Sequence, residues 1–230
     1  MLIIGHRGAA GLAPENSIEA LQKGYDVGAD MLEFDVQLTR DKVPIVIHDS
    51  TLLRTHKSRK FVRWNTHQSI AEIAKKGHAI ATLEEVLDMF FGKVLLNLEV
   101  KSSGTGKIVT QLIKERYIKK PDDWQLILFS SFKIRELVAV RNSSREAAIA
   151  FLHDRTPFNF MLFHRKLQFS AVGFHRLHIS PLALEVAKQL DLFTYAYTVN
   201  RPKAAQLLEA KGIDGVVTDN PEYLRQSLSS

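Results

Sequence analysis

The sequence predicts an α/β fold, a TIM (β/α)8 barrel with a short insertion after the second strand. Its 230 residues contain about eight short runs typical of buried strands, separated by helical patterns, as in repeated βα units around a parallel sheet. No composition shift or linker divides the chain, so we assign residues 1–230 to a single domain. A doubly wound open sheet gives a similar alternation, but a closed barrel accounts for more units at this length.

The expected strands are bounded by turn residues and rich in branched and aromatic side chains. In chain order they are Leu2–Gly5, Met31–Val36, Val94–Val100, Leu126–Phe129, Ala147–Leu152, Ala171–Phe174, Phe193–Val199 and Gly215–Thr218. One additional extended piece, Ile45–His48, follows the second strand. The spacing therefore leaves room for a helix after most strands.

Helix-start signals follow most of the expected strands. Asn16 with Glu19 resembles a capping box, and prolines in the sequence mark the first turns of three further helices, at Pro181, Pro202 and Pro221. Residues 49–81 have no clear place in the repeat, and we interpret them as the insertion, with some helix near Ile70–Lys75. The apolar block at 158–163 is typical of a buried helix or a lid rather than a cofactor site, and we favour the core.

Composition excludes several classes of protein. A content of 45% hydrophobic and 24% charged residues is typical of a soluble globular chain and excludes a disordered one. The absence of cysteine excludes a disulfide scaffold, a zinc-thiolate site and a thiol nucleophile. The apolar run Met1–Gly5 meets His6 and Arg7 too soon for a signal sequence or a membrane span. We therefore expect a cytoplasmic protein without stable membrane insertion.

The net charge of +6 comes from 31 basic and 25 acidic residues, and it is unevenly distributed. Five basic residues lie in the acid-free segment 54–63, namely Arg54, Lys57, Arg59, Lys60 and Arg63. We hypothesise that this segment steers an anionic substrate or lipid surface toward the site. No nucleic-acid motif accompanies it, so we expect a small-molecule partner and no nucleic acid. Both a monomer and a homodimer are compatible with the sequence.

Charged residues stand where barrel strands should be apolar. Glu33 and Asp35 alternate with apolar residues in one strand, and Glu99 does so in the next. Because the outer face of a barrel packs under helices, these carboxylates should face inward near the carboxyl-terminal rim. Three crowded carboxylates favour a hard divalent cation, Mg²⁺ or Ca²⁺. The alternatives are a solvated strand face or internal ion pairs with Arg7 or Lys101.

Two histidines end strands close to these acids. His6 ends the first strand and His48 ends the additional piece. Two histidines on opposite sides of a reacting centre can divide the acid and base roles. Arg7 and Lys101 add positive charge suited to a phosphate. The combination indicates hydrolysis of a phosphate ester, above all of a diester with a poor alcohol leaving group.

An ordered series of motifs extends this interpretation. The motifs are His6-Arg7-Gly8, Pro14-Glu15-Asn16-Ser17, Glu33-Phe34-Asp35-Val36 with Thr39, His48-Asp49, Glu99-Val100-Lys101, Ser131-Phe132, Thr198-Val199-Asn200 and Thr218-Asp219-Asn220-Pro221. From residue 5 to about 222 the chain resembles glycerophosphodiester phosphodiesterases of the bacterial cytosolic type. The resemblance implies a TIM barrel that hydrolyses glycerophosphodiesters to an alcohol and sn-glycerol 3-phosphate with a divalent metal.

The resemblance also implies roles for individual residues. It makes Glu33, Asp35 and Glu99 the metal ligands. It makes His6 and His48 the acid/base pair.

For substrate binding, the resemblance implies that Arg7 and Lys101 contact the phosphate. Glu15, with Asn16, would support the first loop, and Tyr197 would line the glycerol side. Tyr197 itself departs from the family, which usually has Trp there.

Among the remaining residues, Phe174 and His175 form the pair expected nearest the pocket, and we include Phe174 among the substrate-binding residues. Two other functions stay open. One is a lysophospholipase D that uses the same site on a lysophospholipid, and it is motivated by the basic, aromatic-bearing insertion. The other is a binding module with a spent barrel that uses residues 54–64.

Overall fold

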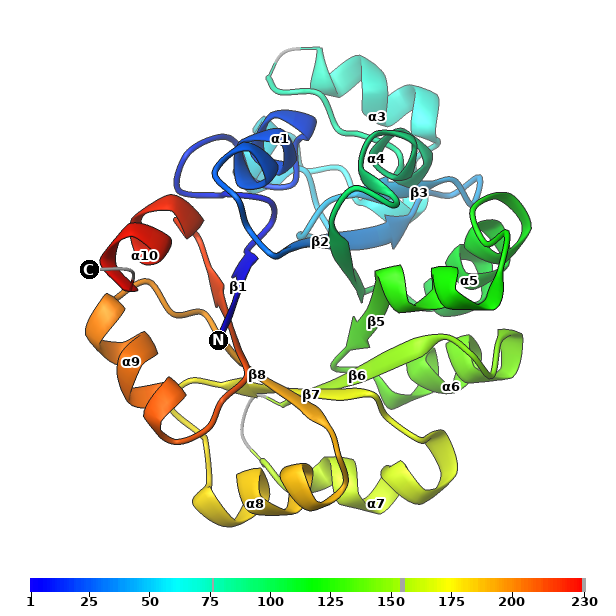
Figure 1. Ribbon diagram of the computed structural model, residues 1–230. Coiled ribbons are helices and arrows are strands. Elements are labelled where there is room, and N and C mark those ends of the chain that lie inside the picture. Colours follow the sequence, from blue (N-terminus) through cyan, green and yellow to red (C-terminus); the bar gives the residue numbers. More distant parts are fainter. Residues whose placement is uncertain (76, 154–155, 229–230) are drawn as a thin grey trace.

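The protein is described by a computed structural model that covers residues 1–75, 77–153 and 156–228. Eight parallel strands form a ring in which β1 pairs with both β2 and β9, so the sheet is closed (Figure 1). Helices surround this ring on the outside. The predicted TIM barrel is confirmed.

The barrel strands agree with the predicted ones to within two residues at each end. They are β1 (Leu2–Gly5), β2 (Met31–Leu38), β4 (Leu95–Val100), β5 (Ile127–Ser131), β6 (Ala148–His153), β7 (Ala171–His175), β8 (Phe193–Tyr197) and β9 (Gly215–Thr218). The additional piece is β3 (Pro44–Val46), which pairs antiparallel with β2 outside the ring.

The helices follow the strands in the expected order. They are α1 (Ile18–Asp26), α2 (Leu53–His56), α3 (His67–Ala74), α4 (Leu83–Phe90), α5 (Thr105–Arg116), α6 (Ile134–Ser143), α7 (Asn159–Leu167), α8 (Pro181–Gln189), α9 (Pro202–Ala210) and α10 (Pro221–Leu228), with two 3-10 turns, η1 (Val62–Trp64) and η2 (Pro121–Leu126). Among the described residues, every helix is too short or too polar to cross a membrane.

The start of α1 differs from the prediction. Ser17, and not Asn16, caps the helix, because its hydroxyl accepts a hydrogen bond of 3.1 Å from the amide of Ala20. Asn16 has a left-handed φ of 58° and its side chain hydrogen-bonds Asp35 instead. The predicted capping box is therefore wrong, and Asn16 belongs to the site.

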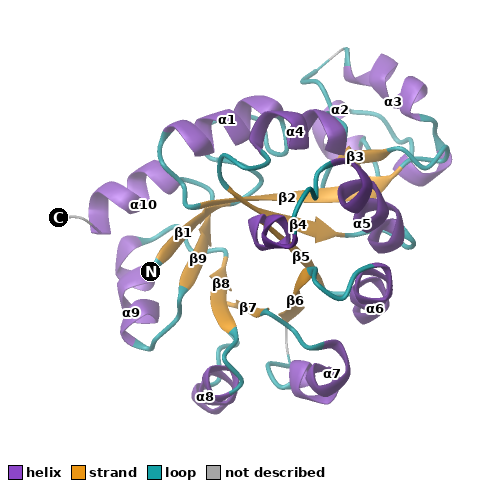
Figure 2. Cartoon of the chain, turned by 45° about the vertical axis from the view of Figure 1, so that its right-hand side comes forward, coloured by secondary structure: helices purple, strands orange, loops and turns teal. Residues whose placement is uncertain are grey.

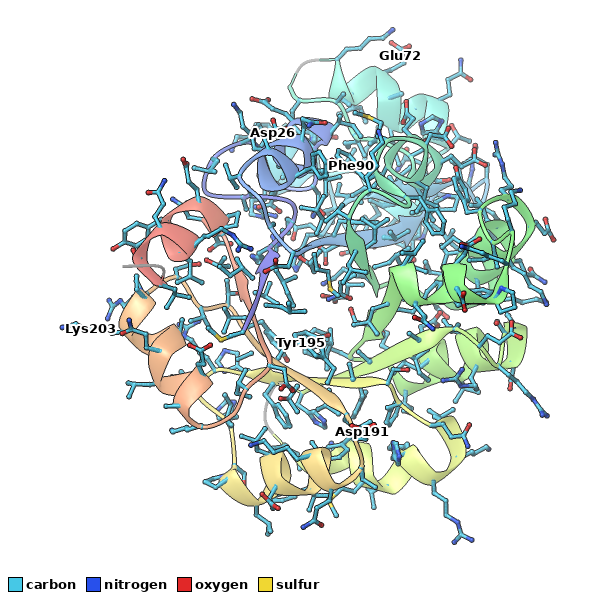
Figure 3. The ribbon with its side chains drawn as sticks, viewed as in Figure 1. Asp26, Glu72, Phe90, Asp191, Tyr195 and Lys203 are labelled. Atoms are coloured by element: carbon cyan, nitrogen blue, oxygen red, sulfur yellow. The ribbon has the colours of Figure 1, made fainter. Side chains whose placement is uncertain are left out.

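Strand alternation sorts side chains into two apolar layers. The outward residues of β2, such as Leu32 and Phe34, are fully buried beneath the helices in the largest cluster. A second cluster fills the inside of the barrel and includes Ile4, Leu128, Leu152 and Tyr195. Figure 3 shows the ring of Tyr195 near the middle of the barrel. Burial of each such side chain contributes roughly 1.5–3 kcal/mol to stability.

The insertion lies beyond the ring of helices. Figure 2 shows α2 and α3 together beside β3, at one edge of the molecule. Its small core contains Ile45, Leu52, Val62 and Ile70. Helix α3 occupies the region where a helix near Ile70–Lys75 was expected, and it begins three residues earlier.

Helix α7 corrects the interpretation of the apolar block at 158–163. Within the block at 158–163 only Phe160 is buried, whereas Leu162 is 77% exposed and Met161 is 44% exposed. The reason is that α7 packs on the barrel through one face, so side chains seven apart, Phe160 and Leu167, face the barrel while those between them, such as Met161 and Leu162, face solvent. The prediction that the whole block belongs to the core is wrong.

Candidate active site

Three carboxylates meet at the carboxyl ends of neighbouring strands. Glu33 and Asp35 lie on β2, Glu99 lies on β4, and the register of the two strands places Asp35 directly beside Glu99. Their oxygens lie within 4.8 Å of one another. The structure thus brings together the three acids that the sequence places on the inner face.

Two cations partly compensate this charge. Nζ of Lys101 lies 2.8 Å from the carboxylate of Glu99 and 3.1 Å from that of Asp35. Nε of Arg7 lies 3.4 Å from Asp35. Glu33 accepts a hydrogen bond of 2.8 Å from the backbone amide of Arg7, and within the described ranges it has no ion pair with lysine or arginine. Three acids against two bases leave the cluster formally one charge negative.

The pKa values of the carboxyl groups show this imbalance. Burial, reinforced by the charge of Asp35, raises the pKa of Glu33 to about 8 and that of Glu99 to about 6. Burial acts in the same direction on Asp35, but Lys101 and Arg7 outweigh it and lower the pKa of that carboxyl. One more positive charge would relieve the repulsion, and an oxygen-only set of ligands fits a hard divalent cation.

Each of the two histidines is held by an acid of its own. Nδ1 of His6 lies 2.6 Å from Oδ1 of Asp219, and Nδ1 of His48 lies 2.7 Å from Oδ1 of Asp49. Burial lowers the pKa of His6, but the hydrogen bond with Asp219 and the negative charges of Glu33 and Asp219 together outweigh it, and the pKa is raised. For His48, burial outweighs the charge of Asp35 and lowers the pKa. Both histidines keep Nε2 for a reacting group.

Asp219 is a positioning residue that the sequence reasoning did not single out. The side chain of Asn200 holds Asp219 through two hydrogen bonds. Its Nδ2 donates to Oδ2 of Asp219 at 2.6 Å, and its Oδ1 accepts from the backbone amide of Asp219 at 2.9 Å. The signal was present in the Thr218-Asp219-Asn220-Pro221 motif. His6 and Asp219 are 213 residues apart, so only the closed barrel reveals the contact.

Replacing Asp219 by asparagine is expected to lower kcat by about one to two orders of magnitude, because His6 loses the acid that orients it. Since Asp219 raises the pKa of His6, the limb of the pH–rate profile that reports His6 should move to lower pH. The exposed Asp191 near α8 is a matched control, and D191N should leave the profile in place (Figure 3). A D219N profile that coincides with that of the parent would contradict this role.

Glu15 and Arg54 connect the first loop to the insertion. Glu15 accepts hydrogen bonds of 2.7 Å from Nη1 of Arg7 and of Arg54, and Nε of Arg54 donates to Asp49 at 2.7 Å. Arg54 therefore braces the acid that holds His48, and its charge is compensated. Glu15 supports Arg7, as expected for the first loop.

Two cavities open on either side of the carboxylates. The first is a narrow pit inside the barrel, lined by His6, Glu33, Asn97, Glu99, Tyr195 and Tyr197 among others. The second is a wide groove that begins at His48 and Lys101 and extends along the insertion past Phe61 and Trp64. The two cavities therefore differ in width and in the side chains that line them.

The structure places Tyr197 in the pit but not Phe174. Phe174 is fully buried beneath the helices, with its ring stacked 5.7 Å from that of His153. Its neighbour His175 lies on the opposite face of β7, with its ring 6.1 Å from that of Tyr197. The prediction that Phe174 binds substrate is wrong, because successive side chains of a strand point to opposite faces and Phe174 lies on the outer face of β7.

Comparison with known proteins assigns the chain to a family. The glycerophosphoryl diester phosphodiesterase family matches residues 6–223. The chain belongs to this family. A glycerophosphodiester phosphodiesterase of Caldanaerobacter subterraneus is 31% identical to it over 97% of this chain and 96% of the relative. A glycerophosphodiester phosphodiesterase of Bacillus subtilis is 27% identical over 98% of this chain and 86% of the relative. As a member, the chain is a phosphoric diester hydrolase.

Solved structures share the fold of this phosphodiesterase. A phosphodiesterase of Oleispira antarctica, in complex with the product sn-glycerol 3-phosphate, superposes with a TM-score of 0.87 at 24% identity, over 100% of this chain and 97% of the other. A glycerophosphodiester phosphodiesterase of Thermotoga maritima gives a TM-score of 0.83 at 24% identity, over 98% and 97%.

Proposed function

We propose that the chain hydrolyses glycerophosphodiesters to an alcohol and sn-glycerol 3-phosphate with one divalent cation, Mg²⁺ or Ca²⁺. The observation that supports this most strongly is the cluster of three carboxylates within 4.8 Å of one another, flanked by two histidines that each pair with an acid. The product bound to the structurally similar phosphodiesterase of Oleispira antarctica, sn-glycerol 3-phosphate, is the product that we propose for this chain.

Glu33, Asp35 and Glu99 would hold the cation. When bound, the cation would withdraw charge from the phosphoryl oxygens of the substrate. Arg7 and Lys101 would contact the same phosphate, since both already lie at the carboxylates and their positive charge stabilises a developing oxyanion.

The two cavities suggest which half of the substrate goes where. The narrow pit suits glycerol, because polar groups such as Asn97 and Glu99 lie beside the ring of Tyr197. His6, which lines the pit, would take the proton of the attacking oxygen, whether that oxygen belongs to water or to a glycerol hydroxyl. His48, which lines the groove, would protonate the departing alkoxide.

Removal of divalent cations is expected to abolish the release of glycerol 3-phosphate from glycerophosphocholine. The reason is that without a cation Glu33, whose pKa is about 8, takes up a proton, and the cluster then withdraws no charge from the phosphoryl oxygens. A coupled assay in excess chelator, followed by addition of Mg²⁺ or Ca²⁺, measures loss and recovery. Full turnover in excess chelator would overturn the metal proposal.

A lysophospholipase D remains the second candidate because of Phe132, which is 41% exposed at the mouth of the pit with its ring 5.9 Å from that of Tyr197. An acyl chain on the glycerol could lie against these two rings. We nevertheless expect faster turnover of glycerophosphocholine than of lysophosphatidylcholine, because the rest of the pit is narrow and partly polar. Comparing kcat/KM for the two substrates tests this. A clear preference for the lysophospholipid would reverse the order of the two candidates.

A further inference from the structure

The groove beside His48 has a surplus of positive charge. Besides Lys101, four lysine or arginine side chains from three separate segments line it, namely Lys42, Arg63, Lys133 and Arg135. Among the residues that the structure describes, the only acid that lines it is Asp49, which already binds His48 and Arg54. The groove is therefore strongly cationic where it leaves the active site.

These four cations lack acidic partners. Within residues 1–75, 77–153 and 156–228, none of them forms an ion pair, and all are exposed. The guanidinium of Arg63 lies 4.8 Å from the centre of the Trp64 ring, and Nζ of Lys133 donates to the backbone carbonyl of Lys101. Neither contact neutralises the charge, so it remains available to a ligand.

The pit on the other side of the site lacks this surplus of basic side chains. Glu33 and Glu99 line it, and no lysine or arginine does so among the described residues. Because the proposed cation would neutralise these carboxylates, a substrate that spans both cavities meets surplus positive charge at the groove end only. This contrast orients an asymmetric diester and selects for the charge of its leaving alcohol.

We propose that the groove binds leaving alcohols that carry a second phosphate, so that the preferred substrates are glycerophosphodiesters of phosphorylated alcohols. This inference rests on the proposed function. A phosphomonoester has a charge of about −1.5 to −2 at neutral pH and three strong acceptor oxygens, which suits several separate cations. Water adds to the diester phosphorus, the bond to the leaving oxygen breaks and that oxygen gains a proton, while the second phosphate stays on the alcohol.

A matched pair of substrates tests the proposal, because glycerophosphoglycerol and its terminal monophosphate differ only by the second phosphate. The loss of the diester signal, followed by phosphorus NMR, gives kcat/KM for each. We expect the phosphorylated substrate to be preferred by about tenfold or more at low salt, and the preference to shrink as salt rises. Equal kcat/KM values for the two substrates would overturn the inference, whereas failure to cleave glycerophosphocholine as well would overturn the proposed function.

Two double variants separate the groove from general surface charge. K42Q/R135Q removes one lysine and one arginine that line the groove and whose side chains form no hydrogen bond or ion pair within the described part of the chain. R59Q/K60Q removes the same two charges from the insertion outside the groove. We expect K42Q/R135Q to reduce the preference at least about fivefold and R59Q/K60Q to preserve it. Equal effects of the two variants would contradict a binding role for the groove.

An anionic membrane is the competing occupant of this surface. Sedimentation with vesicles of phosphatidylglycerol measures it directly. If K42Q/R135Q loses vesicle binding while the substrate preference is unchanged, the groove is a membrane contact and the inference is wrong. If the preference falls and neither protein sediments with the vesicles, the inference is supported.

Discussion

Replacing Glu33 by glutamine is expected to abolish tight binding of the divalent cation and to lower kcat/KM by about 10³-fold, or about 4 kcal/mol of barrier. Gln keeps the shape of the side chain and the hydrogen bond from the amide of Arg7 but removes one of three negative charges. Isothermal titration with Mg²⁺ and Ca²⁺ measures the loss independently of turnover.

The fold should survive this substitution. Glu33 is buried among like charges, so the E33Q protein in excess chelator should melt at the same temperature as the parent or higher. E19Q is the matched control, since Glu19 is an exposed acid on α1 with no side-chain partner among the described residues. Wild-type cation affinity in E33Q would show that the carboxylate cluster is not the metal site.

Replacing His48 by asparagine is expected to lower kcat by about 10²–10⁴-fold for glycerophosphocholine while cation binding is retained. The choline alkoxide is a poor leaving group and depends on the proton that His48 donates. An aryl ester of glycerol 3-phosphate needs no such proton, because the phenolate is stable. H48N should therefore recover most of its activity on the aryl ester.

His6 provides the comparison. H6N should lose a similar factor with glycerophosphocholine, and the aryl ester should not rescue it, because His6 acts on the attacking oxygen. Steady-state kinetics of the two variants on the two substrates measures the difference. Rescue of H6N but not of H48N would exchange the two roles, and rescue of neither would contradict the division of labour.

Local alternation in the sequence was enough to predict the carboxylate cluster. Glu33, Asp35 and Glu99 interrupt apolar strands with a period of two, and a barrel leaves such side chains only the inner face. The eight strands could be predicted for the same reason, since each is a short apolar run between turn signals. The pattern does not show which of two adjacent residues at a strand end faces into the barrel. For this reason Phe174 was chosen as a substrate-binding residue and His175 was not.

Contacts between distant segments could not be read from the sequence. The bonds of His6 with Asp219 and of Glu15 with Arg54 join residues 213 and 39 positions apart. Arg54 was grouped with its basic neighbours by charge alone, although the fold neutralises it with two acids. The groove was equally hidden, because its four cations come from segments that meet only in the closed barrel.

The identity of the products tests the central claim most directly. Glycerophosphocholine can be cleaved on either side of its phosphorus, and phosphorus NMR distinguishes glycerol 3-phosphate from phosphocholine. With glycerol in the pit and His48 at the leaving oxygen, the protein with Mg²⁺ or Ca²⁺ should release only choline and sn-glycerol 3-phosphate, and in labelled water the new oxygen should end in glycerol 3-phosphate. Release of phosphocholine and glycerol would contradict the account.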